Sequence, residues 1–361
     1  MDPEQNLIAA AYDIIGGSGV YIDLLALDGD GIHPQAAGML IISSGLPRCQ
    51  NMDFEDIDSD SETEKNWRLE SLGRHVALWH HELPESLDDS DTLLWWLQIW
   101  DWQDSTMSNC VLSSTVSNAQ ELYGLIDFCF LGSNRLLIVT TDNLKVYSIK
   151  DMSQALQLLA CFLFPAQVEY IKCFPLNLKD NLNLVHIQRT MWTSDPAHQL
   201  LSLLAYSPLL HFVISTSIFF QLDFFEGMAM EIPWKHWGPS NSHVFQDNDM
   251  LDFGVGGSRV LKAIPIVKTA DNDLVEYRLH MMDFSPSAVK HWQGVGEVVR
   301  EPSTVDLEGE LVTTSLPYVE VVSDTKLYHQ PTPVWVNQDR IYVLHTDMES
   351  AGSSMSQGSP S

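Results

Sequence analysis

Short apolar runs separated by turn-forming residues dominate the pattern of hydrophobic and polar positions in this chain of 361 residues. The runs are bounded by Asp, Asn, Gly, Ser and Pro, residues that favour turns. Few segments repeat their apolar residues every 3.6 positions, as an amphipathic helix would. The pattern therefore predicts β-hairpins throughout the chain and an all-β fold.

Several of these hairpins recur, each as a polar turn followed by a strand rich in Leu, Ile or Val. The steps between five strand starts are 86, 43, 124 and 81 residues, at Leu7, Leu93, Leu136, Val260 and Ile341. The steps are close to multiples of about 40 to 45 residues, the length of a four-stranded propeller blade. We therefore predict a β-propeller-like (WD40-like) fold of about six to seven blades. It forms a single domain over residues 1–347. A pair of β-sandwiches would mimic part of the pattern.

The segment Leu93–Ser105 contains four tryptophans and predicts a strand that is buried on both faces. Alternate residues of a strand point to opposite sides. The two faces hold Trp95, Leu97 and Ile99 on one side, and Leu94, Trp96, Trp100 and Trp102 on the other. Propeller blades stack face to face, so an interior strand is covered twice. We interpret the tryptophans as packing between blades.

Two polar segments interrupt the hairpin pattern. Residues 51–66 are acidic and poor in apolar side chains, so we expect a disordered loop there. Residues 348–361 are rich in Ser and Gly and predict a disordered tail.

One stretch imitates a membrane span. Residues 196–222 contain no Asp, Glu, Lys or Arg and are long enough to cross a bilayer. Serines lie within the stretch, and acidic residues flank it without a basic anchor. The turn signal at Tyr206–Pro208 divides it, so we expect two β-strands and no membrane insertion.

Charge and cysteine content limit the partners and the compartment. Lys plus Arg total 19 against 48 Asp plus Glu, a formal charge of −29. Such a chain repels nucleic acid and anionic membranes, so we expect neither as a partner. The charge would attract basic proteins, or it would serve solubility alone. The five cysteines form no CxxC motif, which favours reduced thiols and a cytoplasmic or nuclear location.

No motif in the chain indicates catalysis, a metal or a cofactor. Asp56, Asp58 and Asp60 have the spacing of the first ligands in a calcium-binding loop. The sixth and twelfth positions of that loop are Ser61 and Trp67, where Gly and Glu are needed. We therefore expect no metal, no cofactor and no enzymatic activity.

Two further tryptophans are the candidate partner-binding residues. Trp234 and Trp237 lie among prolines and turn formers within Ile232–Phe245. Exposed aromatic side chains anchor many interfaces. The alternative is that they cap the core of the fold.

Many stretches between Asp2 and His345 resemble a large family of fungal, mainly basidiomycete, F-box-like proteins. The stretches are MDPEQNLIAAAY, LDGDGIHPQAAG, WLQIWDWQDS, LGSNRLLIV, LQLLACFLFP, IPWKHWGPSNS, LHMMDFSPSAV, VVREPSTV and LPYVEVVSD. The resemblance implies a helical F-box that binds a Skp1-like adaptor, followed by a propeller-like region that recruits substrates to a ubiquitin ligase. This sequence starts at the first strand of that region. We therefore expect an incomplete first blade, and an adaptor contact only if an F-box lies upstream.

The predicted function is a non-enzymatic protein-interaction scaffold, similar to the substrate-recruiting region of F-box-type receptors. One alternative is a propeller-fold hydrolase or lyase with its active site in a central channel. Such enzymes bring carboxylates, His or Arg together around the channel. Another is a relic of a truncated gene with no function.

Overall fold

The computed structural model describes most of the predicted strands. The described residues are 2, 5–13, 20–29, 31–41, 67–82, 92–108, 110–117, 126–168, 170–174, 196–206, 209–225, 230–246, 253–268, 275–307, 309–327, 334–336 and 341–343. The predicted acidic loop at 51–66 and the predicted tail at 348–361 lie entirely outside these residues. The prediction that they are disordered stays a prediction.

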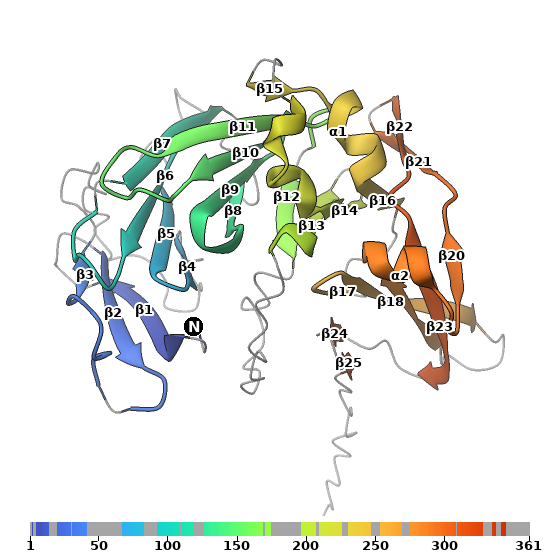
Figure 1. Cartoon of the computed structure of the whole chain (residues 1–361), viewed down its shortest axis with the longest axis horizontal. Coiled ribbons are helices and arrows are strands. Elements are labelled where there is room, and N and C mark those ends of the chain that lie inside the picture. The colour runs from blue at the N-terminus through green and yellow to red at the C-terminus, as the bar shows by residue number, and fades with distance from the viewer. Residues whose placement is uncertain are drawn as a thin grey trace, which may run out of the picture. The chain divides into compact units, whose positions relative to one another are not determined.

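Antiparallel β-sheets make up most of the described chain, so the predicted all-β class is confirmed (Figure 1). The chain divides into two compact units. Unit 1 comprises Met1–Asn248 and Arg300–Leu316, and unit 2 comprises Asp249–Val299 and Pro317–Ser361. The single domain expected over residues 1–347 stays a prediction.

Within the described residues, unit 1 contains four sheets of three to five strands and one two-stranded ribbon. Sheet A consists of β1 (Leu7–Asp13), β2 (Val20–Ala26) and β3 (Leu40–Ile41). Sheet B consists of β4 (Trp67–Leu72), β5 (His75–Glu82), β6 (Thr92–Asp101) and β7 (Cys110–Ser117). Sheet C consists of β8 (Ile126–Phe130), β9 (Arg135–Thr140), β10 (Asn143–Ser148), β11 (Gln157–Leu163) and the parallel strand β15 (Glu231–Ile232).

The last four-stranded sheet and the ribbon complete unit 1. Sheet D consists of β12 (Tyr170–Phe174), β13 (Leu200–Tyr206), β14 (Leu210–Ser215) and β16 (Ser242–Gln246). Helix α1 (Trp234–Asn241) precedes β16, and the ribbon pairs β21 (Ser303–Leu307) with β22 (Glu310–Thr314). Short 3-10 turns occupy Gly132–Asn134, Pro196–His198, Thr216–Phe219 and Leu222–Phe225.

Neighbouring sheets of unit 1 pack face to face in chain order. Leu7 and Ile22 of sheet A share one apolar cluster with Trp100 of sheet B and with Trp102 just after it. On the opposite face of sheet B, Trp95 belongs to a cluster with residues of sheet C. A third cluster joins sheets C and D, α1 and the ribbon. Burial of apolar area in these three layers is the main force that holds the unit together.

The tryptophan-rich strand has the predicted two-sided burial. Trp95 lies on the sheet C side of β6, whereas Trp100 and Trp102 lie on the sheet A side. All three side chains are buried. The indole nitrogen of Trp102 donates a hydrogen bond to the carbonyl of Gly73, at 2.8 Å. The prediction of a strand covered on both faces is therefore confirmed.

Sheet A corresponds to the second, third and fourth strands of sheet B. The amide of Gly73, at the turn between β4 and β5, donates to the carboxylate of Asp2 near the start of β1, at 2.6 Å. The amide of Ala37, in the loop after β2, donates to the carbonyl of Trp102 after β6, at 3.0 Å. β1 and β2 thus run in the same directions as β5 and β6 and pack their inner side chains on these strands, while β1 also contacts β4. Among the described residues, sheet A has no counterpart of β4.

The repeat is longer than the sequence predicted. Corresponding strands begin 68, 60, 65 and 59 residues apart, at Leu7, His75, Arg135, Leu200 and Arg259. Leu93 lies on the third strand of sheet B, whereas Leu136 lies on the second strand of sheet C, so their 43-residue step joins strands that do not correspond. The predicted unit of about 40 to 45 residues is therefore wrong.

Residues 196–222 form the two predicted strands. β13 and β14 pair antiparallel, from Leu200 opposite Ser215 to Ala205 opposite Leu210. Within the described residues, no helix is long and apolar enough to cross a membrane.

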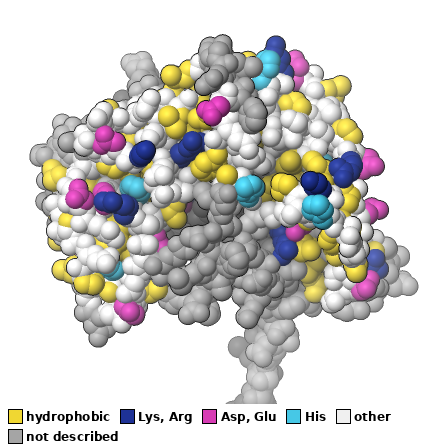
Figure 2. Space-filling view, in the orientation of Figure 1, with side chains coloured by type: hydrophobic (Ala, Val, Ile, Leu, Met, Phe, Trp, Pro, Cys, Tyr) yellow, Lys and Arg dark blue, Asp and Glu magenta, His cyan; other side chains and the backbone are white. Residues whose placement is uncertain are grey.

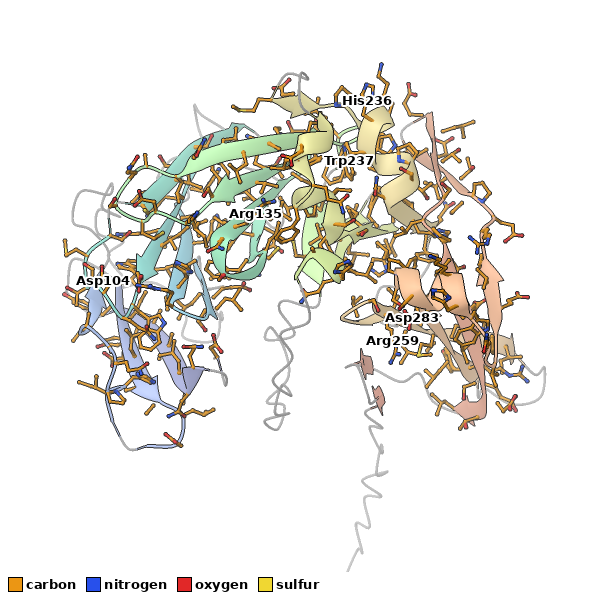
Figure 3. The ribbon with its side chains drawn as sticks, viewed as in Figure 1. Asp104, Arg135, His236, Trp237, Arg259 and Asp283 are labelled. Carbon is orange, nitrogen blue, oxygen red and sulfur yellow. The ribbon has the colours of Figure 1, made fainter. Side chains whose placement is uncertain are left out.

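Unit 2 is built on one five-stranded sheet. Sheet E consists of β17 (Phe253–Gly256), β18 (Arg259–Lys268), β19 (Val275–Asp283), β23 (Tyr318–Leu327) and β20 (Glu297–Val299). Helix α2 (Pro286–His291) follows β19, and a small pair joins β24 (Val334–Val336) to β25 (Ile341–Val343). Arg259 and Asp283 form an ion pair at 3.0 Å across the ends of β18 and β19 (Figure 3).

Candidate functional site

A buried carboxylate joins three consecutive sheets of unit 1. Asp127 on β8 forms an ion pair with Arg68 on β4. The carboxylate also accepts hydrogen bonds from the backbone amides of Phe128, at 2.8 Å, and of Cys173 on β12, at 2.7 Å. Arg68 in turn pairs with Glu70 at 2.6 Å, and its guanidinium lies 4.8 Å from the ring centre of Phe128. We call these residues the Arg68–Asp127 junction.

The junction is suited to hold the sheets together and poorly suited to proton transfer. Asp127 is engaged by one cation and two amides that come from three different sheets. Both carboxylate oxygens are already engaged, Oδ1 by Arg68 and the Phe128 amide and Oδ2 by the Cys173 amide. Burial raises the pKa of the neighbouring Cys173 thiol well above its ordinary value. A thiol in that state is a poor nucleophile.

A serine and a histidine form a second buried polar pair, on sheet D. The hydroxyl of Ser202 on β13 is hydrogen-bonded to Nε2 of His211 on β14. His243 on β16 lies on the same face, and its Nδ1 is 3.2 Å from the carbonyl of Leu316. A serine bonded to a histidine is the arrangement of a nucleophile with its base. Both side chains are buried, however, so a substrate would need an opening to reach them.

The two predicted partner-binding tryptophans lie on α1. The Trp237 side chain is fully buried, and its indole nitrogen donates to the carbonyl of Leu163 on β11, at 3.1 Å. Figure 3 labels Trp237 on this helix. Trp234 is half-buried, and its ring lies 4.7 Å from Trp237 and 6.3 Å from Phe212, centre to centre. Both rings thus contribute to the core between sheets C and D. A partner-binding role for either residue stays a prediction.

Exposed apolar side chains lie on two loops that touch each other. Ile32 is 74% exposed and Met39 46% exposed, in the loop between β2 and β3. Met107 is 62% exposed, in the loop after β6. The side-chain amide of Gln103 donates to that of Gln35, at 3.2 Å, which joins the two loops. We call Ile32, Met39 and Met107 the loop surface.

Sheet A carries an aromatic and acidic group on the face turned away from sheet B. Tyr12 on β1 lies directly opposite Tyr21 on β2, with stacked rings 6.1 Å apart. The Tyr12 hydroxyl donates to the carboxylate of Asp23, at 3.3 Å. Burial and the charge of Asp23 raise the pKa of Tyr12. The alternation of residues 7–26 holds a signal for this group, since two antiparallel strands there place both tyrosines on one face.

The structure does not describe the other candidates from the sequence. Asp56, Asp58, Asp60 and Ser61 lie outside the described residues. In the described part of the chain, no three His, Cys, Asp or Glu side chains are grouped as a metal site would need. The described cysteines, Cys110, Cys129, Cys161 and Cys173, are buried and free. On the face drawn in Figure 2, charged side chains of both signs lie among hydrophobic ones.

No family model matches the chain, and no curated protein matches it either.

Proposed function

We propose that this protein is a non-enzymatic protein-interaction module built from propeller-like blades. The observation that carries the proposal is the loop surface. Ile32 and Met107 hold their apolar side chains largely in solvent, on loops of two adjacent, well-packed sheets. Exposed hydrophobic side chains on neighbouring loops of a rigid scaffold are typical of protein interfaces. The polar groups of the Arg68–Asp127 junction, by contrast, bind one another and the backbone.

The propeller-like architecture belongs to the same proposal. Its support is the stacking of meandering sheets A, B, C and D in chain order, and the regular step between corresponding strands. At about 60 residues per sheet, the chain has room for about six blades. The first blade is incomplete in this proposal, since sheet A has no described counterpart of β4.

The biological role that we propose is substrate recruitment, as in F-box-type ubiquitin-ligase receptors. This part rests on the sequence resemblance alone. It implies a cytoplasmic or nuclear protein, with a Skp1-like adaptor as partner only in a form that carries an F-box upstream.

The loop surface provides the direct test. The full chain, and a variant with Ile32→Ser and Met107→Ser, would be used for cross-linking and quantitative mass spectrometry in cells. We expect a defined set of proteins with the parent chain and a loss of at least several of them with the variant. Gly31→Ala is a matched control in the same loop, because an added methyl group there meets no atom within 4 Å. Equal recovery from the parent and the double variant would contradict the proposal.

The Ser202–His211 pair supports a second candidate, a hydrolase. An activated serine reacts with fluorophosphonate probes, and the reaction needs a base such as His211. Covalent labelling of Ser202, lost in Ser202→Ala and in His211→Gln, would support the enzyme. The interaction module predicts that the probe does not label Ser202, which is buried.

A further inference from the structure

We propose that the outer face of sheet A binds an extended, basic protein segment, whose arginine stacks on Tyr12 and Tyr21 and pairs with Asp23. The outer face comprises Ile8, Ala10 and Tyr12 of β1 and Tyr21, Asp23 and Leu25 of β2. The inference rests on the proposed function, since it names one surface and one partner chemistry for an interaction module.

The pairing of the two strands places these six side chains in three rows. Tyr12 lies opposite Tyr21, Ala10 opposite Asp23, and Ile8 opposite Leu25. An aromatic row, an acidic row and an aliphatic row thus follow one another along the sheet.

The two faces of sheet A differ in burial. Leu7, Val20, Ile22 and Leu24 are buried against sheet B. On the outer face, Ala10 is exposed, and the other five side chains are half-buried. Both faces of β6 in sheet B are covered, as the burial of Trp95 and Trp100 shows. The outer face of sheet A therefore presents apolar area that the neighbouring sheet leaves open.

The chemistry of this face favours a guanidinium. A cation placed over a tyrosine ring is attracted by the ring, and arginine can stack flat on it. The carboxylate of Asp23, hydrogen-bonded to Tyr12, supplies the negative charge beside the rings. The formal charge of −29 on the chain also attracts a basic partner at long range. A second copy of this chain is disfavoured on the same grounds, because it would bring a second negative chain and a second Asp23 to the face.

The experiment measures binding of a fluorescein-labelled nonapeptide with alternating Arg and Val to the full chain, by fluorescence polarisation. Tyr21→Leu and Asp23→Asn should each weaken binding about two- to fivefold, as exposed cation–π contacts and ion pairs do. The double variant should lose about tenfold if the two effects add. Tyr12→Phe keeps the ring and should retain most of the affinity. Replacing Arg by citrulline in the peptide should abolish most of the binding.

Asp104→Asn is the matched control. It removes the same charge from an exposed position on the turn after β6 (Figure 3). An equal loss with Asp104→Asn and Asp23→Asn would overturn the proposal in favour of general charge attraction. Unchanged affinity in the double variant would overturn it as well. A dimer in sedimentation velocity that Tyr21→Glu dissociates would overturn it too, because a second copy would then cover this face. Protection of Tyr12 and Tyr21 from hydroxyl radicals in the monomer without peptide would also overturn it, because the chain itself would then cover the face.

Failure of this inference can be told apart from failure of the proposed function. Cellular partners that depend on Ile32 and Met107, but persist in the Tyr21→Leu/Asp23→Asn variant, would overturn the peptide site and leave the interaction module standing.

Discussion

Asp127 on β8 accepts a hydrogen bond from the backbone amide of Cys173 on β12, at 2.7 Å, and thereby ties sheet C to sheet D. The same carboxylate pairs with Arg68 on β4 and so reaches sheet B. Apolar packing between sheets is non-directional, whereas this group accepts bonds in fixed geometry. We infer that the junction fixes the relative positions of the three sheets, which hydrophobic packing alone would define less sharply.

Replacing Asp127 with Ala should lower the free energy of unfolding by about 2–4 kcal/mol, because it leaves a largely buried guanidinium and two buried amides without this acceptor. Urea denaturation followed by tryptophan fluorescence would measure the loss. Asp104→Ala removes an exposed carboxylate and should change stability by less than about 0.5 kcal/mol. A similar small effect of Asp127→Ala would contradict the structural role of the junction.

Truncating a tryptophan on either face of β6 should lower the free energy of unfolding. Trp95→Ala and Trp100→Ala each leave a large cavity between sheets, and such changes typically cost about 3–5 kcal/mol. The two losses should be of similar size because each indole is buried against a different neighbouring sheet. Chemical denaturation of the two variants tests this. A loss of stability in only one of the two variants would show that one face of the strand is exposed to water.

The sequence predicted the elements of the fold better than their arrangement. Trp95 and Trp100 were assigned to opposite buried faces because period-two alternation fixes which side chains share a side. The predicted repeat length was wrong because Leu93 and Leu136 lie in similar local patterns but on the third strand of one sheet and the second strand of the next. A turn followed by a strand does not reveal which position that strand takes in its sheet.

The candidate sites were harder to predict for a physical reason. Arg68 and Asp127 belong to different sheets and meet only through sheet packing, which no local motif encodes. Tyr12 and Tyr21 meet through a hairpin, so their pairing follows from register alone and was within reach of the sequence. The prolines and turn formers around Trp234 and Trp237 left open whether the two rings bind a partner or cap the core; in the structure a short helix turns both rings toward the core.

Gly238 on α1 should not tolerate a side chain. A Cβ at this position would lie 2.3 Å from the ring of Trp234, so the ring would have to leave Trp237 and Phe212. Overpacking of this kind costs about 1–3 kcal/mol, more than the gain of about 1 kcal/mol from Ala in a helix. We expect Gly238→Ala to be destabilising in thermal denaturation and Gly31→Ala to be nearly neutral. A stabilised Gly238→Ala would mean that Trp234 does not pack over the helix.

Two buried histidines predict how stability changes with pH. Burial lowers the pKa of His75, an effect that the charge of Asp101 partly offsets and that of Arg74 reinforces. Burial also lowers the pKa of His243, although its bond to the carbonyl of Leu316 acts in the opposite direction. The folded protein then binds fewer protons than the unfolded chain near the ordinary histidine pKa of about 6.5. The stability contribution is therefore fully present above that pH and is lost as the pH falls through it.

We expect the free energy of unfolding to decrease from pH 7.5 to pH 5.5, a window that lies above the titration of ordinary carboxyl groups. The measurement is urea denaturation at several pH values within that window. A variant with both His75→Gln and His243→Gln cannot take up these protons, so its stability should depend less on pH, even if it is lower throughout. Since each single variant removes one of the two groups, each should show an intermediate slope. Identical slopes for the parent and the double variant would mean that neither imidazole resists protonation in the folded state, and that the two side chains are more accessible to water than their burial indicates.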